Sequence, residues 1–201
     1  TGGKQGTQVS RAVGKSVSLQ QLNVASREEF VSALRPLFNN ETWPLELAWE
    51  SRPFGDVNEL RAAIQVAVLT ADDSRRAALI HDYPAMDKLL LADADEAATI
   101  SADRGSLGLT DLDDVQTERI TELSAAYRER FDMPFVAYLD TNDTVDRVID
   151  AGVRRLANSQ EQEYRTALGE IVEIANDRFD ILLADANPVR SSWDRKFTEV
   201  D

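Results

Sequence analysis

The chain has 201 residues, which suits one domain with tails, and its 43% of hydrophobic residues is enough for a sizeable core. Its 36 acidic and 22 basic residues give a net charge of −14, which disfavours nucleic-acid and membrane partners because such a surface repels phosphate groups. Cysteine is absent, which excludes disulfides and thiol chemistry, and the lack of a long apolar run or signal segment predicts a cytoplasmic protein.

The first part of the chain carries several signals for helix starts. Residues 1–16 are expected to be a disordered leader, because the opening stretch is polar and rich in glycine. Ser26 followed by Glu29 is a capping-box pattern, and apolar residues then recur at helical spacing. Pro36 falls inside that pattern and predicts that the helix ends or distorts there. Trp43-Pro44 predicts a further helix, because proline is tolerated in a first turn.

Two more helices are predicted before residue 84. Asp56 with Glu59 forms a cap-like pair ahead of an apolar stripe. Ser74 is expected to cap a short helix, which should end before Pro84, because the residue preceding a proline avoids helical geometry. Residues 88–101 are weakly patterned, and 105–108 are predicted to form a loop.

The second half of the chain is also predicted to be helical. Thr110 is expected to cap a helix that runs to the region of residue 131. The apolar stretch Met133–Leu139 predicts either a strand or a buried extended segment. Asp143 or Thr144 is expected to begin the next helix, and a long helix follows. Because helices do not alternate with strands, the fold class is all-α, with a single domain of about eight helices over 17–186 and a tail over 187–201.

Motif searches exclude several chemistries. The sequence has no glycine-rich phosphate loop and no nucleophile elbow. With one histidine, His81, and no cysteine, most zinc arrangements are excluded, and no metal site is predicted. Most carboxylates are expected to be solvated surface groups. The residues taken alone therefore indicate an acidic helical domain and do not identify its chemistry.

Several segments resemble one enzyme family, the 2-oxo-4-hydroxy-4-carboxy-5-ureidoimidazoline (OHCU) decarboxylases of urate degradation. The residues that carry the resemblance lie between about 22 and 183: Leu22-Asn23, Arg27-Glu28-Glu29-Phe30, Trp43, Arg52-Pro53-Phe54, Leu79-Ile80, Pro84, Gly108-Leu109, Tyr127, Arg130-Phe131, Pro134-Phe135-Val136, Arg155-Leu156-Ala157-Asn158, Ala167-Leu168-Gly169-Glu170, Ile174 and Arg178. The family signature Y-x-x-R-F-G-F-P-F-V is matched at six positions: Tyr127, Arg130, Phe131, Pro134, Phe135 and Val136. The resemblance is more specific in the second half of the chain than in the middle.

The resemblance implies a decarboxylation that needs no cofactor. The imidazoline ring of the family's substrate contains C=N and C=O groups that accept the electrons left when carbon dioxide departs. The protein has to orient and desolvate the carboxylate and then protonate the carbanion-like centre. The family uses a His, a Glu and an Arg for this work. The resemblance also implies a small-molecule substrate and a homodimer.

The family's functional residues map onto this sequence with two changes. The His position, directly before Pro84, is occupied by Tyr83. The Glu position is Asp103, and the Gln that follows it is Arg104. The Arg is retained as Arg178. The backbone stretch that cradles the ring corresponds to five consecutive residues: Phe135, Val136, Ala137, Tyr138 and Leu139.

The changed residues alter the chemistry that the site can perform. Tyrosine, with a pKa of about 10, donates a proton but is a weaker base than imidazole, whose pKa is about 6.5. Asp103 keeps the charge of the family's Glu with a shorter reach. A shift of two residues would place His81 at the catalytic position, although Leu79-Ile80 and Pro84 align without a gap only if Tyr83 takes it. Otherwise His81 is interpreted as a helix-end residue near solvent.

Three functions follow from these residues. The first is decarboxylation of the ureidoimidazoline, with Tyr83 as proton donor, Asp103 bound to a ring hydroxyl or amide, and Arg178 holding an anionic group. The second is an enzyme of the same fold that acts on another small anionic heterocycle, since Tyr83, Asp103 and Arg104 rebuild one wall of the site. The third is a non-catalytic protein that binds a small ligand or a partner. Arg155 is expected to form a structural ion pair in all three.

Overall fold

The computed structural model describes residues 17–86, 112–139 and 143–183. These residues form eight α-helices and one 3-10 turn, and none of the described residues forms a β-strand. The elements are α1 (Leu19–Val24), α2 (Arg27–Leu34), η1 (Arg35–Leu37), α3 (Trp43–Trp49), α4 (Val57–Thr70), α5 (Asp73–His81), α8 (Asp114–Phe131), α9 (Val145–Arg155) and α10 (Gln160–Leu182). The predicted all-α class is therefore confirmed.

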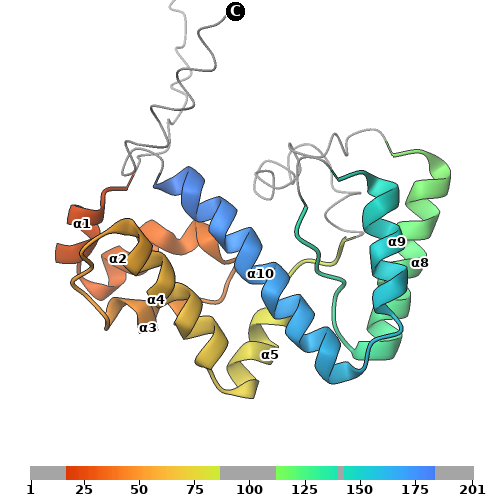
Figure 1. Cartoon of the computed structure of the whole chain (residues 1–201), viewed down its shortest axis with the longest axis horizontal. Helices are drawn as coiled ribbons and strands as arrows, with labels where there is room; N and C mark the ends of the chain where they lie inside the picture. The colour runs from red at the N-terminus through yellow and green to blue at the C-terminus, as the bar shows by residue number, and fades with distance from the viewer. Residues whose placement is uncertain (1–16, 87–111, 140–142, 184–201) are drawn as a thin grey trace, which may run out of the picture.

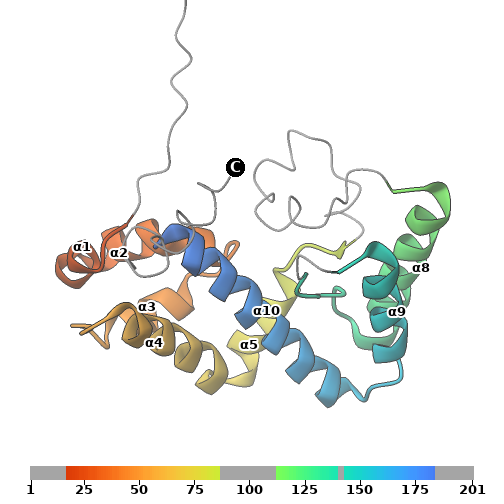
Figure 2. The ribbon, with the colours of Figure 1, turned by 45° about the horizontal axis from the view of Figure 1, so that its top comes forward.

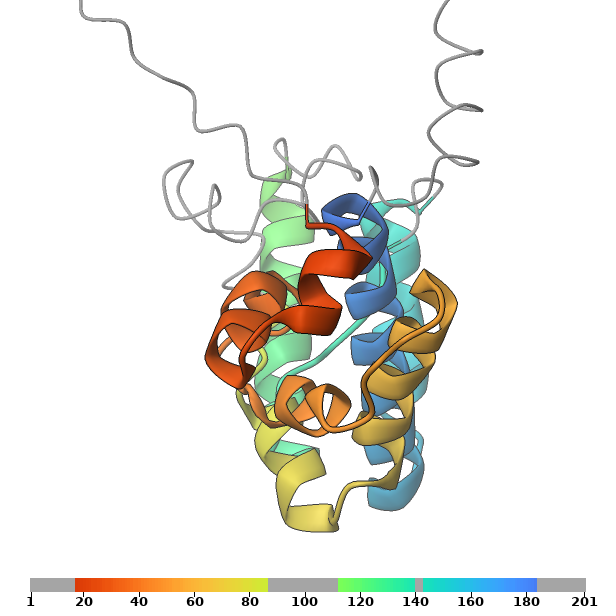
Figure 3. The same cartoon turned by 90° about the vertical axis from the view of Figure 1, so that its left-hand side faces the viewer.

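The long helix α10 crosses the middle of the molecule. Figure 1 shows α1 to α4 on one side of it and the α8–α9 pair on the other. The turned view in Figure 2 keeps this order. Contacts join α10 to α4, α5 and η1, while α8 packs against α9. Figure 3, seen from the left-hand side of Figure 1, has α1 nearest the viewer and the α8–α9 pair at the back.

Local sequence signals account for most of the helix starts. Ser26 forms a full capping box with Glu29 at the start of α2, and Asp56 caps α4 through the Glu59 amide. Helix α2 gives way to the 3-10 turn that contains Pro36, as predicted. Thr144 caps α9. These starts are fixed locally because a side-chain oxygen satisfies an amide that has no partner within its own helix.

Two predicted caps are wrong. Helix α5 is capped by Asp72, whose carboxylate accepts from the Arg75 amide, so Ser74 lies inside the first turn. Helix α8 is capped by Asp113 in a capping box with Gln116, and Thr110 lies outside the described residues. In both cases an aspartate near the predicted position takes the role, because carboxylates are at least as good as hydroxyls at an N-cap.

The family motifs near the start of the chain meet in space. The Asn23 side chain donates to the Phe54 carbonyl (2.9 Å) and accepts from the Phe54 amide (2.8 Å). Arg52 donates to the carbonyls of Asn23 (3.1 Å) and Ala25 (2.6 Å) and stacks over the Trp49 ring at 4.2 Å. These residues hold α1 against the turn after α3. The family motif residues in this region therefore stabilise the fold.

Residues 133–139 link α8 to the segment before α9 without helical or strand structure. Met133, Phe135 and Val136 are buried in the core, and the next three residues are partly buried. Of the two predictions for this stretch, the strand is wrong, and the burial expected of the alternative is confirmed. We call residues 135–139 the cradle segment.

Candidate active site

Arg178 lies near the end of α10, with its guanidinium directed at the loop after η1. Its Nη1 lies 3.4 Å from the Leu37 carbonyl oxygen and 3.4 Å from Asn39 Oδ1. The other end of the Asn39 amide, Nδ2, is buried and has no hydrogen-bond partner in the described part of the chain. Buried polar groups are nearly always paired, so Asn39 presents a donor that a ligand oxygen can satisfy.

The same loop also binds the end of α5, which Tyr83 and Pro84 follow in the sequence. Asp82 accepts from both the backbone amide and the side-chain amide of Asn40, each at 2.8 Å. Asn39 and Asn40 therefore connect Arg178 to the residue that precedes Tyr83. Tyr83 itself is only 7% exposed. The loop that contacts Arg178 is thus also bound to the end of α5, one residue before Tyr83.

The cradle segment contacts α10 at two positions, one of which lies next to Arg178. The Tyr138 amide donates to Glu170 Oε2 at 2.7 Å, and the Tyr138 hydroxyl donates to Asp177 Oδ2 at 2.7 Å. Asp177 immediately precedes Arg178. Two of the predicted site elements, the cradle segment and Arg178, therefore adjoin one another on α10.

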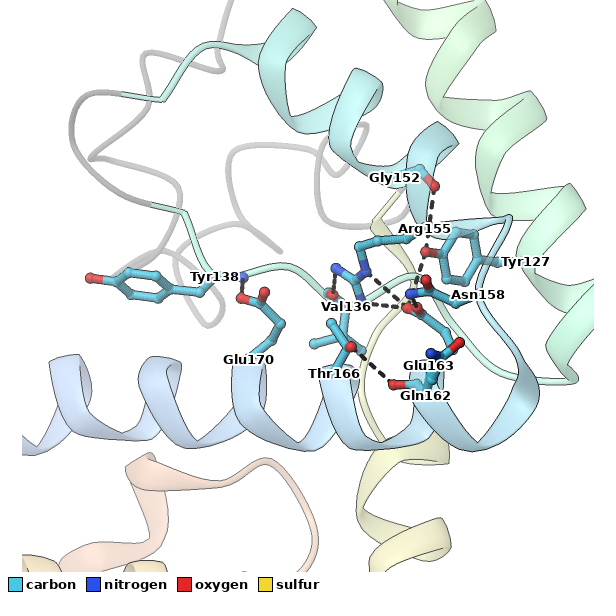
Figure 4. Close-up of polar contacts among 10 residues, drawn as sticks. All are labelled: Tyr127, Val136, Tyr138, Gly152, Arg155, Asn158, Gln162, Glu163, Thr166 and Glu170. Carbon is cyan, nitrogen blue, oxygen red and sulfur yellow. Dashed lines mark hydrogen bonds and ion pairs between the residues drawn. The ribbon is translucent and has the colours of Figure 1, made fainter.

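A buried ion pair contacts the cradle segment (Figure 4). Glu163 is fully buried and accepts from Arg155 Nε (2.9 Å) and Nη2 (2.5 Å), the Asn158 side chain (2.8 Å) and the Tyr127 hydroxyl (3.1 Å). Arg155 Nη1 also donates to the Val136 carbonyl at 2.8 Å. Burial raises the pKa of Tyr127, so its hydroxyl remains a donor. Arg155 forms the structural ion pair that the sequence predicted.

Glu170 is partly buried and lies on the same face of α10 as Glu163, seven residues further along the chain. Partial burial raises the pKa of its carboxyl, opposed by the Tyr138 amide and by Arg155, while Glu173 and Glu163 raise it further. Glu163, Glu170 and Asp177 are spaced seven residues apart. Because seven residues are about two helical turns, the three carboxylates lie on one face of α10 and follow the course of the cradle segment.

His81 is the last residue of α5 and is exposed. Its Nε2 lies 3.1 Å from the Tyr164 hydroxyl on α10. Tyr164 precedes Arg178 by 14 residues, which is about 21 Å along a helix. This position favours the interpretation of His81 as a helix-end residue near solvent.

The remaining predicted residues, Asp103 and Arg104, lie outside the described residues. In the part of the chain that is described, no group of three or more His, Cys, Asp or Glu side chains is arranged to hold a metal ion. Likewise, no described helix is long and apolar enough to cross a membrane.

Asn39, Glu163 and Glu170 were not predicted as site residues. A glutamate among the apolar positions of the last helix is a weak sequence signal for Glu163. Asn39 gives no such signal, because its role depends on a contact with a residue 139 positions away.

Comparison with known proteins gives consistent matches over most of the chain. The family model for OHCU decarboxylase matches residues 23–180. A 2-oxo-4-hydroxy-4-carboxy-5-ureidoimidazoline decarboxylase from Haloferax volcanii is 37% identical over 164 residues, which are 81% of this chain and 94% of that protein. A protein of the same name from Mus musculus is 32% identical over 181 residues, or 87% of this chain and 98% of that one.

Solved structures show the same fold. The crystal structure of an (S)-allantoin synthase has a TM-score of 0.63 at 22% identity and is matched over 83% of this chain and 54% of its own. An OHCU decarboxylase crystallised in the presence of (S)-allantoin has a TM-score of 0.60 at 13% identity, over 80% of this chain and 99% of its own. With the family model matched over most of its length and relatives above 30% identity, this chain belongs to the OHCU decarboxylase family.

Proposed function

We propose that this protein decarboxylates 2-oxo-4-hydroxy-4-carboxy-5-ureidoimidazoline, the substrate in the names of its relatives, to (S)-allantoin. The observation that carries the proposal is a set of contacts: the loop after η1 links Arg178 to the end of α5, and the cradle segment binds the residue before Arg178. Within a family of this activity, these are the positions to which the resemblance assigns the chemistry.

Each described element has a role in the proposed reaction. Arg178, with the Asn39 amide beside it, supplies hydrogen-bond donors for an anionic group of the substrate, and charge-assisted bonds of this kind are strong. The backbone of the cradle segment meets the ring. Ala137, in the middle of that segment, makes no hydrogen bond in the described part of the chain, so its amide and carbonyl are available to a ligand.

Tyr83 is proposed to supply the proton to the carbanion-like centre. A phenol is protonated at neutral pH and can donate to a strongly basic carbanion-like centre, and the burial of Tyr83 at the end of α5 keeps competing water away. Asp103 is proposed to bind a ring hydroxyl or amide, with Arg104 beside it. The reaction then needs only the electron-accepting groups of the substrate's own ring.

The test is decarboxylation of freshly generated substrate. Urate oxidase and the hydrolase that follows it would produce the unstable ureidoimidazoline in the cuvette, and circular dichroism would follow (S)-allantoin above the racemic background. We expect catalysis by the wild type and a loss of about 10²- to 10⁴-fold in Tyr83→Phe, the usual contribution of a general acid. Tyr164→Phe, which removes a hydroxyl bound to His81, is the matched control and should keep wild-type activity.

Tyr83→His tests the assignment of the position itself. If Tyr83 occupies the place of the family's His, this variant should be at least as active as the wild type. An inactive wild type that is well folded would exclude this substrate, and the search would move to other small anionic heterocycles.

We also propose that the protein is a cytoplasmic homodimer. Family resemblance supports the dimer, and the absence of cysteine fits a reducing compartment. Light scattering coupled to size-exclusion chromatography should give about twice the chain mass of 22.4 kDa, and a monomer mass would contradict the proposal.

A further inference from the structure

The cradle segment is held at two backbone atoms by side chains from two different helices. Arg155, the last residue of α9, donates to the Val136 carbonyl at 2.8 Å. Glu170, in the middle of α10, accepts from the Tyr138 amide at 2.7 Å. Figure 4 shows these two contacts, at Val136 and at Tyr138. In the sequence, only Ala137 separates the two residues. The position of the Ala137 backbone is therefore fixed from both ends.

The contact at Val136 is built into the core. The guanidinium of Arg155 is oriented by the fully buried Glu163, and Glu163 is itself saturated by donors from Tyr127 and Asn158. Removing one partner of such a pair leaves a buried charge without compensation and unfolds or destabilises the protein. A variant at this end would therefore not separate a role in function from a role in folding.

The contact at Tyr138 is of a different kind. Glu170 is only partly buried, and the Tyr138 amide is its one hydrogen-bond partner among the described residues. Its carboxylate interacts electrostatically with Arg155 but makes no hydrogen bond to another helix among the described residues. A carboxylate in this place is costly to desolvate, yet it forms a stronger bond to an amide than a neutral acceptor does.

We propose that Glu170 is a positioning residue: by holding the Tyr138 amide, it sets the Ala137 backbone in the place where the substrate ring binds. The inference rests on the proposed function and deepens it. Binding groups have to be held within about 0.5 Å of their productive positions, and a displacement of about 1 Å can cost roughly 10²-fold in rate. The cradle segment has no strand partner in the described residues, so its geometry depends on these side-chain contacts.

The test compares Glu170→Ala, Glu170→Gln and the matched control Glu173→Gln in the full chain. Glu173 is exposed on the same helix, and its side chain makes no hydrogen bond in the described part of the molecule. We expect Glu170→Ala to lower kcat/KM about 10- to 100-fold while the protein stays folded. Glu170→Gln, which keeps an acceptor oxygen, should recover most of that loss, and Glu173→Gln should match the wild type. Equal kinetics for Glu170→Ala and Glu173→Gln would overturn the proposal.

Hydrogen exchange at the Tyr138 amide gives a readout that does not depend on activity. Exchange should be faster in Glu170→Ala than in the wild type and unchanged in Glu173→Gln. If the wild type proves inactive on the ureidoimidazoline, the proposed function fails, and exchange then decides the positioning inference by itself. Unchanged exchange at Tyr138 in Glu170→Ala would overturn it.

Discussion

The side-chain amide of the partly buried Asn39 has two different surroundings at its two ends. Its Oδ1 faces the guanidinium of Arg178, and its Nδ2 is buried without a partner in the described residues. An unpaired buried donor costs stability, typically about 1–3 kcal/mol. Such a cost is reasonable at a binding site, where the ligand supplies the missing acceptor.

Replacing Asn39 by Asp should weaken substrate binding. The new carboxylate would pair with Arg178 and repel an anionic substrate, so we expect KM to rise about tenfold or more, equivalent to about 1.4 kcal/mol per factor of ten. Asn176→Asp is the matched control: it makes the same change on α10, where the Asn176 Oδ1 accepts from Gln65 at 2.9 Å. Steady-state kinetics of both variants measure the difference, and an equal rise in KM for the two would contradict a role for Asn39 at the site.

Glu170 should also leave a signature in the pH dependence of stability. Because its pKa in the folded state is raised, mainly by burial, the folded protein binds this proton more tightly than the unfolded chain does. The contribution of Glu170 to the free energy of unfolding is therefore greatest below its ordinary pKa, and it is lost as the pH rises through its higher folded-state pKa.

Glu170→Gln removes that titration and should change the pH profile in one direction. The difference in free energy of unfolding, variant minus wild type, should be more negative at acidic pH than at pH 7. It should rise between the pKa of Glu170 in the unfolded chain and its higher pKa in the folded protein. Urea denaturation at a series of pH values measures this. A difference that stays constant with pH would contradict the prediction.

At the scale of elements, two helical glycines are in opposite surroundings. A Cβ on Gly152 in α9 would lie 2.5 Å from Leu123 Cδ2 and 2.8 Å from Phe135 Cζ. This close approach lets α9 pack against α8 and against the start of the cradle segment. A Cβ on Gly169 in α10 would meet nothing within 4 Å.

Gly152→Ala and Gly169→Ala should therefore change stability with opposite signs. We expect Gly152→Ala to cost about 1–3 kcal/mol, because the added methyl overfills a packed contact. Gly169→Ala should gain up to about 1 kcal/mol, because alanine has the higher helix propensity. Chemical denaturation of the two variants measures both values, and a loss for both would show that α10 needs Gly169 for another reason.

The helix starts show how far local signals reach. The capping pairs at Ser26 and Asp56 could be read directly, because the cap and its partner are three residues apart. Asp72 and Asp113 were missed in favour of nearby hydroxyl residues. Each error is small, because a wrongly predicted cap moves the start of the helix by a few residues and leaves the predicted packed face of the helix unchanged.

At the scale of the whole molecule, the charge of −14 is the dominant electrostatic feature. Most described ion pairs join exposed side chains, among them Arg27–Glu50 and Arg119–Asp150, and such pairs contribute little. The excess of acidic groups repels itself and opposes the compact state. If Arg178 and Asn39 bind an anionic substrate as proposed, their attraction acts only over a short range.

Raising the concentration of sodium chloride should stabilise the protein. Screening reduces repulsion among carboxylates more than it weakens the exposed ion pairs, because the Debye length falls from about 30 Å at 0.01 M to about 10 Å at 0.1 M. A gain of about 1 kcal/mol corresponds to roughly 2–4 °C in Tm for a chain of this size. Thermal melts between 0.01 and about 0.3 M salt measure the shift, and a Tm that falls with salt would contradict this account.

The sequence alone determined the all-α class, most helix starts, the structural role of Arg155 and the resemblance to a decarboxylase family. These features depend on spacing within a helix or on motifs that can be read along the chain. Only the tertiary structure decided that Asn39 faces Arg178, that Asn40 holds the end of α5, and that Glu170 supports the cradle segment. The physical reason is that each of these contacts joins residues at least 32 positions apart, brought together by the packing of η1, α5 and the cradle segment on α10.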